Sequence, residues 1–361
     1  MNRGVFMKSK SGSFRITGFF AFLGILSALA VLGAFTTCSN TTGTTPATLL
    51  ETPSVYIVGY YTDDSASNKA CYWKDEIKTD LPVESENSIA TAIAVSGGSI
   101  YCAGSFNDGT YARACYWKDG VMIKLPGGTA NSYVNSIAVS GGSVYCAGYY
   151  RAGTTYIACY WKDGVMINLP GGTAYSYVNS IAVSGGSVYC AGYYYDGTKD
   201  IACAWKDGTR TDLFPGTYDS VAGMIKVSGE SIHIAGYFDD GAGNRAWHWK
   251  DGIRTDLTMG TDETTAIAIA VHDESVYVAG LAGIIFSDSA KACYWKNGIV
   301  TILPSGLYGS AASAIAVSGG SIHVAGFYGH YSATRACYWK DGVNTGLPGG
   351  TGSMAFGIAI E

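Results

Sequence analysis

The chain has 361 residues, a formal net charge of −5 and 49 glycines, and 48% of its residues are hydrophobic. The acidic balance excludes a nucleic-acid-binding protein, because that function needs a basic surface. Ten cysteines are present, but no two are spaced as Cys-x-x-Cys, so the sequence predicts neither a metal site nor a cofactor.

The first 38 residues predict an export signal. Four basic and no acidic residues precede Cys38, and an apolar run from Gly18 to Phe35 leads into Thr36, Thr37 and Cys38. This arrangement resembles a bacterial lipoprotein signal peptide, in which the cysteine is lipidated after cleavage. The alternative is an uncleaved membrane anchor, since the apolar run is only slightly short of a full span. Both alternatives predict a protein tethered to a lipid bilayer in the bacterial cell envelope, on the outer surface or the periplasmic face.

Residues 39–53 are polar, rich in threonine and without periodicity, which predicts a flexible tether. A chain of this length spans a root-mean-square distance of about 20 Å. No later stretch is long and apolar enough to span a membrane. The remainder of the chain, residues 54–361, is therefore expected to form the exported domain.

A repeat fills this domain. Tryptophan marks each copy, with successive spacings of 44, 44, 44, 44, 46 and 44 residues: Trp73, Trp117, Trp161, Trp205, Trp249, Trp295 and Trp339. A period in the forties that combines strand-forming residues with tight-turn glycines predicts a β-propeller with one blade per repeat. The sequence therefore predicts an all-β, seven-bladed β-propeller.

The copy at 135–173 shows the plan of a blade. Its four predicted strands cover residues 135–140, 143–149, 157–162 and 165–169. Gly141-Gly142 joins the first two strands, and Asp163-Gly164, a strong hairpin signal, joins the last two. Each repeat therefore predicts one four-stranded blade.

The two ends of the repeat region predict how the ring closes. Ser54 enters at the second strand of a blade that lacks its first strand, whereas residues 356–360 match an isolated first strand. The last strand is therefore expected to complete the first blade. Such closure leaves no edge strand open to pair with another molecule.

A short sequence motif carries a family resemblance. Arg-Ala-Cys-Tyr-Trp-Lys-Asp-Gly occurs at 113–120 and 335–342, and Thr-Asp-Leu occurs at 211–213 and 255–257. Together with the recurring Pro-Gly-Gly, this pattern resembles the HAF-type extracellular repeat of bacterial surface proteins. That repeat has His-Ala-Phe ahead of its tryptophan. This chain has Arg, Ile or Lys in place of the histidine and mostly Cys in place of the phenylalanine. The resemblance implies an exported repeat protein over residues 54–361 and assigns no activity.

Cysteines and tryptophans recur at fixed blade positions. Cysteines flank a short turn in three consecutive blades, which predicts three directly opposed pairs: Cys102 with Cys115, Cys146 with Cys159, and Cys190 with Cys203. Export makes disulfides possible, yet Cys71, Cys293 and Cys337 have no such partner. We expect buried, unbridged thiols, with disulfides as the alternative. The tryptophans are expected in the core, with the indole N–H bound to a backbone carbonyl.

Both tight turns of a blade lie at the same end of its strands, so the longer loops gather on the opposite face of the ring. Candidate ligand-binding residues on or near these loops are Tyr150, Tyr175, Tyr194, Tyr218, Tyr308, Tyr328 and His330. Tyrosine gives a large contact area at low entropic cost. Lys226 replaces an alanine found in the other six blades, so it is a candidate anion contact; a solvated lysine is the alternative.

Two functions follow from these features. The first is a surface-tethered lipoprotein whose loop-rich face binds a protein or a glycan without catalysis. The alternative is an exported enzyme that acts on glycans at the channel mouth, which needs a histidine-centred site or two carboxylates about 5 to 9 Å apart. The carboxylates on the loop face come from different blades without a pattern, which favours the binding function: Glu84, Glu86, Asp219, Asp262 and Glu263.

Overall fold

The computed structural model describes residues 53–84, 87–172, 174–214, 216, 218–257, 259, 263–305, 308–329 and 333–361. The predicted signal segment, including Cys38, and the predicted tether up to residue 52 lie outside the described residues, as do His330, Glu86 and Asp262. Within the described ranges, no helix is long and apolar enough to cross a membrane.

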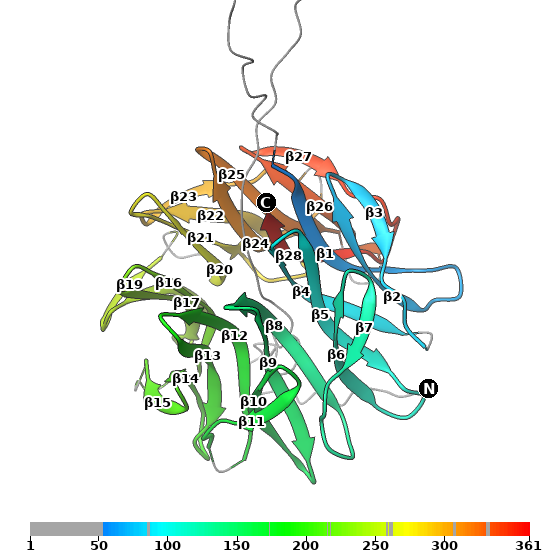
Figure 1. Cartoon of the computed structure of the whole chain (residues 1–361). Helices are drawn as coiled ribbons and strands as arrows, with labels where there is room; N and C mark the ends of the chain where they lie inside the picture. The colour runs from blue at the N-terminus through cyan, green and yellow to red at the C-terminus, as the bar shows by residue number, and fades with distance from the viewer. Residues whose placement is uncertain are drawn as a thin grey trace, which may run out of the picture.

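Seven four-stranded antiparallel sheets stand side by side around a central axis (Figure 1). The first strand of each sheet contacts the first strands of both neighbouring sheets, so these seven strands surround the axis. The prediction of a seven-bladed β-propeller is therefore confirmed.

The blades are numbered along the chain, and their strands are given from the axis outward. Blade 1 contains β28 (Met354–Ile360), β1 (Val55–Thr62), β2 (Asn68–Lys74) and β3 (Ile77–Asp80). Blade 2 contains β4 (Ser88–Ser96), β5 (Ser99–Asn107), β6 (Ala112–Lys118) and β7 (Val121–Lys124). Blade 3 contains β8 (Ser132–Ser140), β9 (Ser143–Ala152), β10 (Thr155–Lys162) and β11 (Val165–Asn168). Blade 4 contains β12 (Ser176–Ser184), β13 (Ser187–Tyr195), β14 (Asp200–Lys206) and β15 (Thr209–Asp212). Blade 5 contains β16 (Ser220–Ser228), β17 (Ser231–Asp239), β18 (Asn244–Lys250) and β19 (Ile253–Asp256). Blade 6 contains β20 (Thr264–His272), β21 (Ser275–Ala282), β22 (Lys291–Lys296) and β23 (Ile299–Ile302). Blade 7 contains β24 (Ser310–Ser318), β25 (Ser321–Tyr328), β26 (Arg335–Lys340) and β27 (Val343–Gly346).

The C-terminal strand closes the ring. β28 pairs antiparallel with β1, with Ile360 opposite Val55 and Met354 opposite Tyr60. All seven residues of β28 are buried. Beyond the strand ends, Ser54 and Glu361 exchange backbone hydrogen bonds of 2.6 and 3.1 Å. The predicted closure is confirmed.

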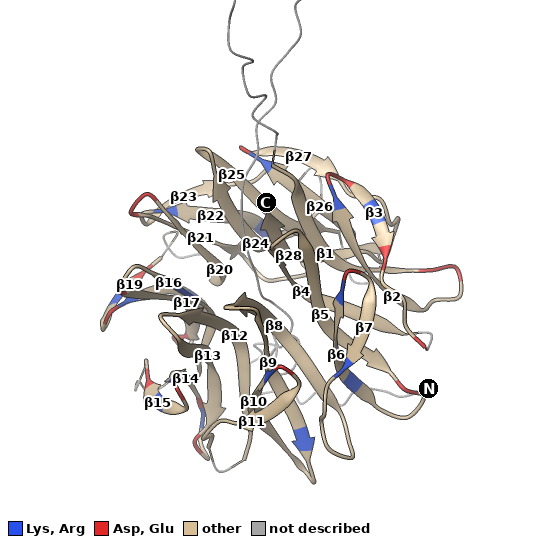
Figure 2. Ribbon diagram, viewed as in Figure 1, with Lys and Arg blue, Asp and Glu red and all other residues tan. Residues whose placement is uncertain are grey.

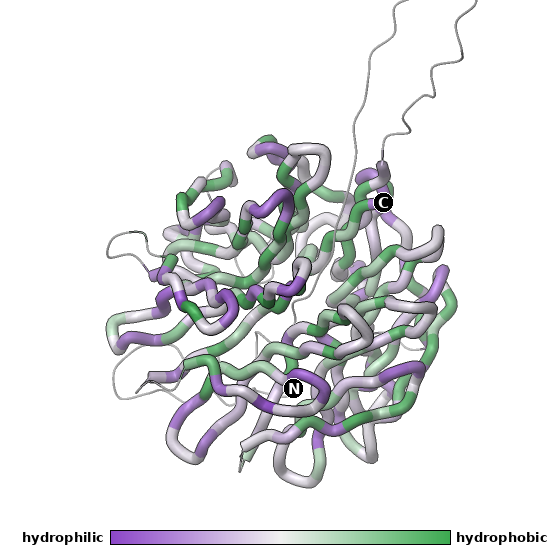
Figure 3. The backbone as a smooth tube through the Cα atoms, turned by 60° about the vertical axis from the view of Figure 1, so that its left-hand side comes forward, coloured by the Kyte–Doolittle hydropathy of each residue, from purple (hydrophilic) through white to green (hydrophobic). Residues whose placement is uncertain are grey.

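Tryptophan side chains fill the spaces between blades, as expected. Trp117 on β6 is fully buried, and its indole N–H donates to the carbonyl of Pro82 in the preceding blade at 2.8 Å. The same bond forms at Trp73, Trp161, Trp205 and Trp339, but the expectation fails at Trp295, whose buried indole N–H has no partner among the described residues. Blade 5 differs, because Trp247 is the buried ring there and Trp249 is partly exposed. Hydrophobic residues follow the strands, and hydrophilic residues gather at the turns (Figure 3).

Both tight turns of each blade lie on one face of the ring, which we call the lower face; the opposite face is the upper face. In blade 3, Asp163 and Gly164 have φ of 48° and 83°, the left-handed values of a type I′ turn. Asp163 Oδ1 accepts the backbone N–H of Val144 at 2.9 Å, which ties this turn to the neighbouring Gly-Gly turn. The equivalent bond occurs in all seven blades.

The nine described cysteines are buried and unbridged, as expected. The predicted opposition of cysteine pairs is wrong by two residues, because Cys102 lies opposite Trp117 and Cys115 lies opposite Gly104. The same offset recurs in blades 3 and 4, where Cys146 lies opposite Trp161. Burial raises the pKa of the Cys102 and Cys115 thiols, so these groups stay protonated and unreactive.

The offset has a simple cause in the loop between the second and third strands. A direct opposition of Cys102 and Cys115 requires a loop centred on Asp108-Gly109 in blade 2. Strand pairing instead ends at Asn107 and Ala112, which centres the loop one residue later and shifts every opposed pair by two. The residue opposite the third-strand cysteine is a glycine, such as Gly104. A Cβ at this position would clash with the backbone of the inner strand.

Candidate functional site

The upper ends of blades 3 and 4 carry neighbouring tyrosine rings. Tyr133 on β8 lies opposite Tyr149 on β9, and Tyr177 on β12 lies opposite Tyr193 on β13. The ring centroids are 5.0 Å apart in both pairs. Tyr149 and Tyr177 connect the two blades through an edge contact with centroids 4.7 Å apart. The four rings therefore form a continuous aromatic surface across the blade boundary.

Three further tyrosines extend this surface outward. The ring of Tyr156 on β10 lies 5.4 Å from that of Tyr149, and Tyr175 stacks on Tyr195 at 5.0 Å. Tyr149 and Tyr193 are buried, whereas the outer three rings are partly exposed. We call the seven residues the tyrosine cluster: Tyr133, Tyr149, Tyr156, Tyr175, Tyr177, Tyr193 and Tyr195. The cluster has a buried floor and a solvent-facing rim.

A buried carboxylate lies beside these rings. Asp200, the first residue of β14, is 6% exposed and accepts a hydrogen bond from the Tyr175 hydroxyl. The backbone N–H of Asp200 donates to Asp219 Oδ1 of blade 5 at 2.8 Å, which fixes its position. Burial raises the pKa of Tyr177, and the charges of Tyr156 and Asp200 add to the shift. The site therefore offers protonated hydroxyl groups next to a carboxyl acceptor.

The opposite side of the upper axis is apolar. Leu281, Phe327 and Phe356 belong to a buried cluster formed by blades 6, 7 and 1. Leu281 and Phe327 occupy the second-strand position that holds Tyr149 and Tyr193 in blades 3 and 4. The upper end of the ring is therefore two-sided, with several hydroxyl groups and a carboxylate on one side and, on the other, packed hydrocarbon in which Tyr60 is the one tyrosine among the described residues.

A repeated bulge fixes the blades that carry the tyrosine cluster. Asn135 and Asn179 are the extra residues of the bulges in β8 and β12, two positions after Tyr133 and Tyr177. A bulge leaves backbone groups without a ladder partner. Asn135 Nδ2 donates to the carbonyl of Val178 at 2.7 Å, and Asn179 Nδ2 makes the same bond to blade 5 at 2.9 Å. These buried bonds hold neighbouring inner strands in register below the cluster.

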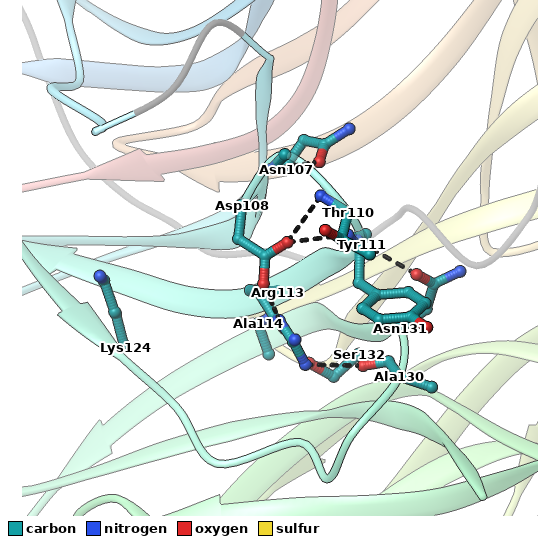
Figure 4. Close-up of polar contacts among 12 residues, drawn as sticks. Asn107, Asp108, Thr110, Tyr111, Arg113, Ala114, Lys124, Ala130, Asn131 and Ser132 are labelled. Carbon is teal, nitrogen blue, oxygen red and sulfur yellow. Dashed lines mark hydrogen bonds and ion pairs between the residues drawn. The ribbon is translucent and has the colours of Figure 1, made fainter.

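The upper loops are held by carboxylate side chains, as the loop between β5 and β6 illustrates (Figure 4). Asp108 Oδ1 accepts the backbone N–H groups of Thr110 and Tyr111 at 2.9 and 2.8 Å, and Oδ2 binds the Arg113 guanidinium. These bonds lower the pKa of Asp108 to about 2. Arg113 also donates to the carbonyl of Ala130 in blade 3 at 3.0 Å. Loops tied in this way present a preformed upper face.

Three of the sequence-predicted tyrosines share one position on the second strand. Tyr150, Tyr194 and Tyr328 come one residue after the position of Tyr149 and Tyr193, so they point to the other face of the sheet. The Tyr194 hydroxyl donates to Asp212 Oδ2 at 3.0 Å, and the Tyr150 hydroxyl accepts from Asn168 at 3.2 Å. In blades 3 and 4, these hydroxyl groups therefore bind the fourth strand of their own blade.

The other predicted tyrosines lie apart from one another. Tyr175 belongs to the tyrosine cluster. Tyr218 and Tyr308 lie on upper loops before β16 and β24 and are 46% and 56% exposed. The structure therefore brings together one predicted tyrosine with six that the sequence argument did not select. A signal for them exists in the sequence, because only blades 3 and 4 have tyrosine at the second position of the first strand, in Tyr133 and Tyr177.

The carboxylates considered for catalysis are dispersed. Glu84 forms an exposed ion pair with Lys124 at 2.6 Å, and Asp219 holds the backbone of Asp200. Burial raises the pKa of Glu263, and the charge of Asp239 adds to the shift. In the part of the chain that the structure describes, no three His, Cys, Asp or Glu residues are grouped so that they could hold a metal ion.

Lys226 lies on the inner strand β16, opposite His233. Its side chain keeps partial exposure, and burial lowers its pKa from the usual 10.5 to about 8. Most other charged residues gather at turns and on outer strands (Figure 2). Lys226 is therefore a cation that the folded ring holds at a cost in free energy.

We expect Lys226→Ala, which restores the residue of the other six blades, to stabilise the ring at pH 7 by up to about 3 kcal/mol. Below pH 8 Lys226 is charged in both the folded and the unfolded chain, so the free-energy cost of burying its charge does not change with pH. Between pH 8 and 10.5 Lys226 is deprotonated in the folded ring but still protonated in the unfolded chain. The stability of the parent therefore rises with pH, and the stability difference between parent and variant disappears. Urea unfolding at pH 7 and pH 10 measures both values, with the exposed Lys250→Ala as control. A destabilised Lys226→Ala variant at pH 7 would contradict this account.

Comparison by sequence finds no matching family model and no matching curated protein. Among solved structures, the chain is similar to an acylaminoacyl peptidase of Pyrococcus horikoshii, with a TM-score of 0.50 and 14% identity over 81% of this chain. The likeness shows the fold alone. The match covers 50% of the peptidase chain, so this chain spans about half of its length. The protein YjhT is also similar, with a TM-score of 0.45, 12% identity and coverage of 71% of this chain and 96% of that chain.

Proposed function

We propose that the ring is a binding module that contacts a ligand through the exposed rim of the tyrosine cluster on its upper face, where the buried Asp200 holds the Tyr175 hydroxyl, without a catalytic step. The observation that carries this proposal is the two-sided upper end of the ring. Seven tyrosines gather over two neighbouring blades, five of them partly exposed. Large rigid rings of this kind give contact area at low entropic cost.

A glycan is the ligand that this chemistry fits best. A sugar ring presents apolar C–H faces that pack on aromatic rings. Its hydroxyl groups need both donors and acceptors, and each exposed tyrosine hydroxyl can act as either. The inter-blade bonds of Asn135 and Asn179 hold the cluster in place before binding, which lowers the cost of ordering. A protein chain is the second ligand class.

The proposal includes a location in the bacterial cell envelope. The lipoprotein-like segment that ends at Cys38 and the tether 39–53 support attachment to a lipid bilayer. The tether joins the ring at Ser54, at the lower end of β1, next to the turn at Asp75. Attachment at the lower face directs the tyrosine cluster away from the bilayer.

The test is a glycan array with residues 54–361, followed by calorimetry with the glycan that binds. We expect Tyr177→Ala to weaken binding about tenfold or more, as for a central aromatic contact. Tyr177→Phe keeps the ring and should retain most of the affinity. The control is Tyr111→Ala, which removes a 37% exposed tyrosine from the upper loop of blade 2.

Two results would overturn the proposal. The first is a ligand whose binding survives Tyr177→Ala and Tyr133→Ala. The second is a search with the glycan array and with protein pull-down that yields no ligand for the parent ring.

A further inference from the structure

A ring of exposed aliphatic side chains surrounds the lower face. In six blades the first residue of the fourth strand is valine or isoleucine, and each side chain is 66% to 76% exposed: Ile77, Val121, Val165, Ile253, Ile299 and Val343. Thr209, also exposed, occupies this position in blade 4. Exposed hydrophobic residues are ordinary when they are scattered singly. These six recur at one position of the repeat, so all of them lie on the lower face.

Strand propensity alone does not account for the aliphatic ring. The position favours a β-branched residue, as strands do. Thr209 meets that preference in blade 4 without exposing as much hydrocarbon, so the fold accepts threonine here. Six blades nevertheless place a purely aliphatic side chain in solvent. Six exposed aliphatic side chains on one face offer apolar area that a partner covering this face would bury.

The distribution of the six side chains around the rim favours a large, flat partner. The six side chains belong to six separate blades, so they form isolated points around a rim rather than one patch. Each lies opposite a lysine at the end of the third strand, as Lys118 lies opposite Val121. In blade 2 the ammonium lies over the Tyr101 ring, 5.4 Å from its centroid. A rim that alternates aliphatic tips with amphipathic lysine stems matches the boundary between lipid head groups and acyl chains.

We propose that the lower face rests on the surface of a lipid bilayer, with the aliphatic ring inserted at the boundary between head groups and acyl chains. The point where the first 52 residues join the ring supports a bilayer over a second copy of the chain. Val55 N–H donates to Asp75 Oδ1 at 2.8 Å, in the hairpin that carries Ile77. A tether of about 20 Å root-mean-square reach thus starts beside the aliphatic ring. This inference rests on the proposed lipid anchor.

Charge has a minor part in this contact. The lysine at the end of each third strand is followed by aspartate, or by Asn297 in blade 6, so the charges of the rim nearly cancel. Insertion therefore depends on the aliphatic side chains, and neutral lipids suffice. If attraction of the lysines to anionic lipids held the ring on the bilayer, binding would require anionic lipids.

The experiment uses the full chain reconstituted into phosphatidylcholine vesicles. Thr209→Cys places an environment-sensitive fluorophore at the seventh position of the rim and leaves all six aliphatic residues intact. The nine described native cysteines are buried and the proposed lipid blocks Cys38, so the label is directed to the new thiol. Ile284→Cys carries the control label, because Ile284 is an aliphatic residue on an upper loop and is 54% exposed.

With brominated acyl chains in the vesicles, we expect the Thr209 label to be quenched and shifted to the blue, and the Ile284 label to be unaffected. Replacement of the six aliphatic residues by threonine should reduce quenching at Thr209 to the level of the Ile284 control. The chain should remain folded, because blade 4 already carries threonine there.

Four results would overturn the proposal. A chain that does not float with the vesicles lacks the anchor on which the inference rests. Equal quenching of both labels contradicts the orientation. A blue shift at Thr209 without quenching shows that a second copy of the chain covers the ring. Quenching that is absent in phosphatidylcholine and appears only in a second set of vesicles with added anionic lipid assigns the contact to the lysines. None of these measurements depends on the ligand of the upper face.

Discussion

A chain that ends at Ser353 should lose cooperative folding. The deletion removes β28, whose seven residues are all buried, and exposes the inner edge of β1. It also removes Met354, Phe356 and Ile358 from the core. Loss of each large buried side chain costs about 2–5 kcal/mol, against a total stability of about 5–15 kcal/mol. Circular dichroism during thermal unfolding should show a broad transition in place of the sharp one of the parent.

A synthetic peptide of residues 353–361 provides the control. Added in excess, it should bind the open edge of blade 1 and restore part of the cooperative transition, because the missing ladder partner is supplied from outside. A chain without β28 that melts cooperatively at the temperature of the parent would refute closure by this strand.

Mild acid should destabilise the ring through its buried histidines. His323 is fully buried and lies 2.6 Å from the Tyr338 hydroxyl, and His248 lies 3.2 Å from His233. Burial is the main cause that lowers the pKa of His323 and of His248 to about 4, and nearby Lys340 and His233 contribute. Above pH 6.5 these histidines are neutral in both states. As the pH falls from 6.5 towards 4, the unfolded chain binds protons that the folded ring excludes, so stability is lost.

His323 and His248 each contribute up to about 3 kcal/mol to this loss. The triple variant His233→Tyr, His248→Tyr and His323→Tyr has the aromatic residues that blade 3 carries at these positions, Tyr145 and Tyr160. It should unfold in urea at pH 5 with nearly the stability that it has at pH 7, whereas the parent should lose several kcal/mol. His272→Gln, at the partly exposed end of β20, is the control. An equal loss in parent and triple variant would assign acid sensitivity to other groups.

The architecture could be predicted from the sequence because its signals are repeated. Seven tryptophans at a nearly constant spacing and seven tight turns predict the same four-stranded blade in each repeat. A strand that is hard to assign in one blade can therefore be assigned from the others. Closure followed from two incomplete ends, Ser54 and Phe356, that match only each other. Packing then had to place the tryptophans between blades, where five indole N–H groups bind proline carbonyls.

Pairing register could not be predicted with the same certainty, because it depends on loop geometry. A shift of one residue in the centre of the loop moves every opposed pair by two. This displaced Cys115 from Cys102 to Gly104. The inner-strand bulges are a second feature without a clear sequence signal. The extra residue of the bulge is asparagine in blades 3 and 4, but it is glycine in blade 5 (Gly223) and isoleucine in blade 6 (Ile267).

The candidate site shows the same limit. Tyr149 and Tyr150 are adjacent in sequence, and strand alternation sends one towards the tyrosine cluster and the other towards the outer strand. The choice between them needs the register of the inner strands. Asp200 gave no sequence signal of its own, because its burial depends on rings from other strands and on Asp219 of the next blade.

The most direct test of the account is hydroxyl-radical footprinting of residues 54–361 with and without the bound ligand. The account predicts protection from oxidation at the exposed rim of the tyrosine cluster, at Tyr156, Tyr175 and Tyr195, with no change at Tyr308 or in the lower-face hairpins. Protection confined to the lower-face hairpins, or to the loops of Tyr218 and Tyr308, would contradict the assignment of the binding site.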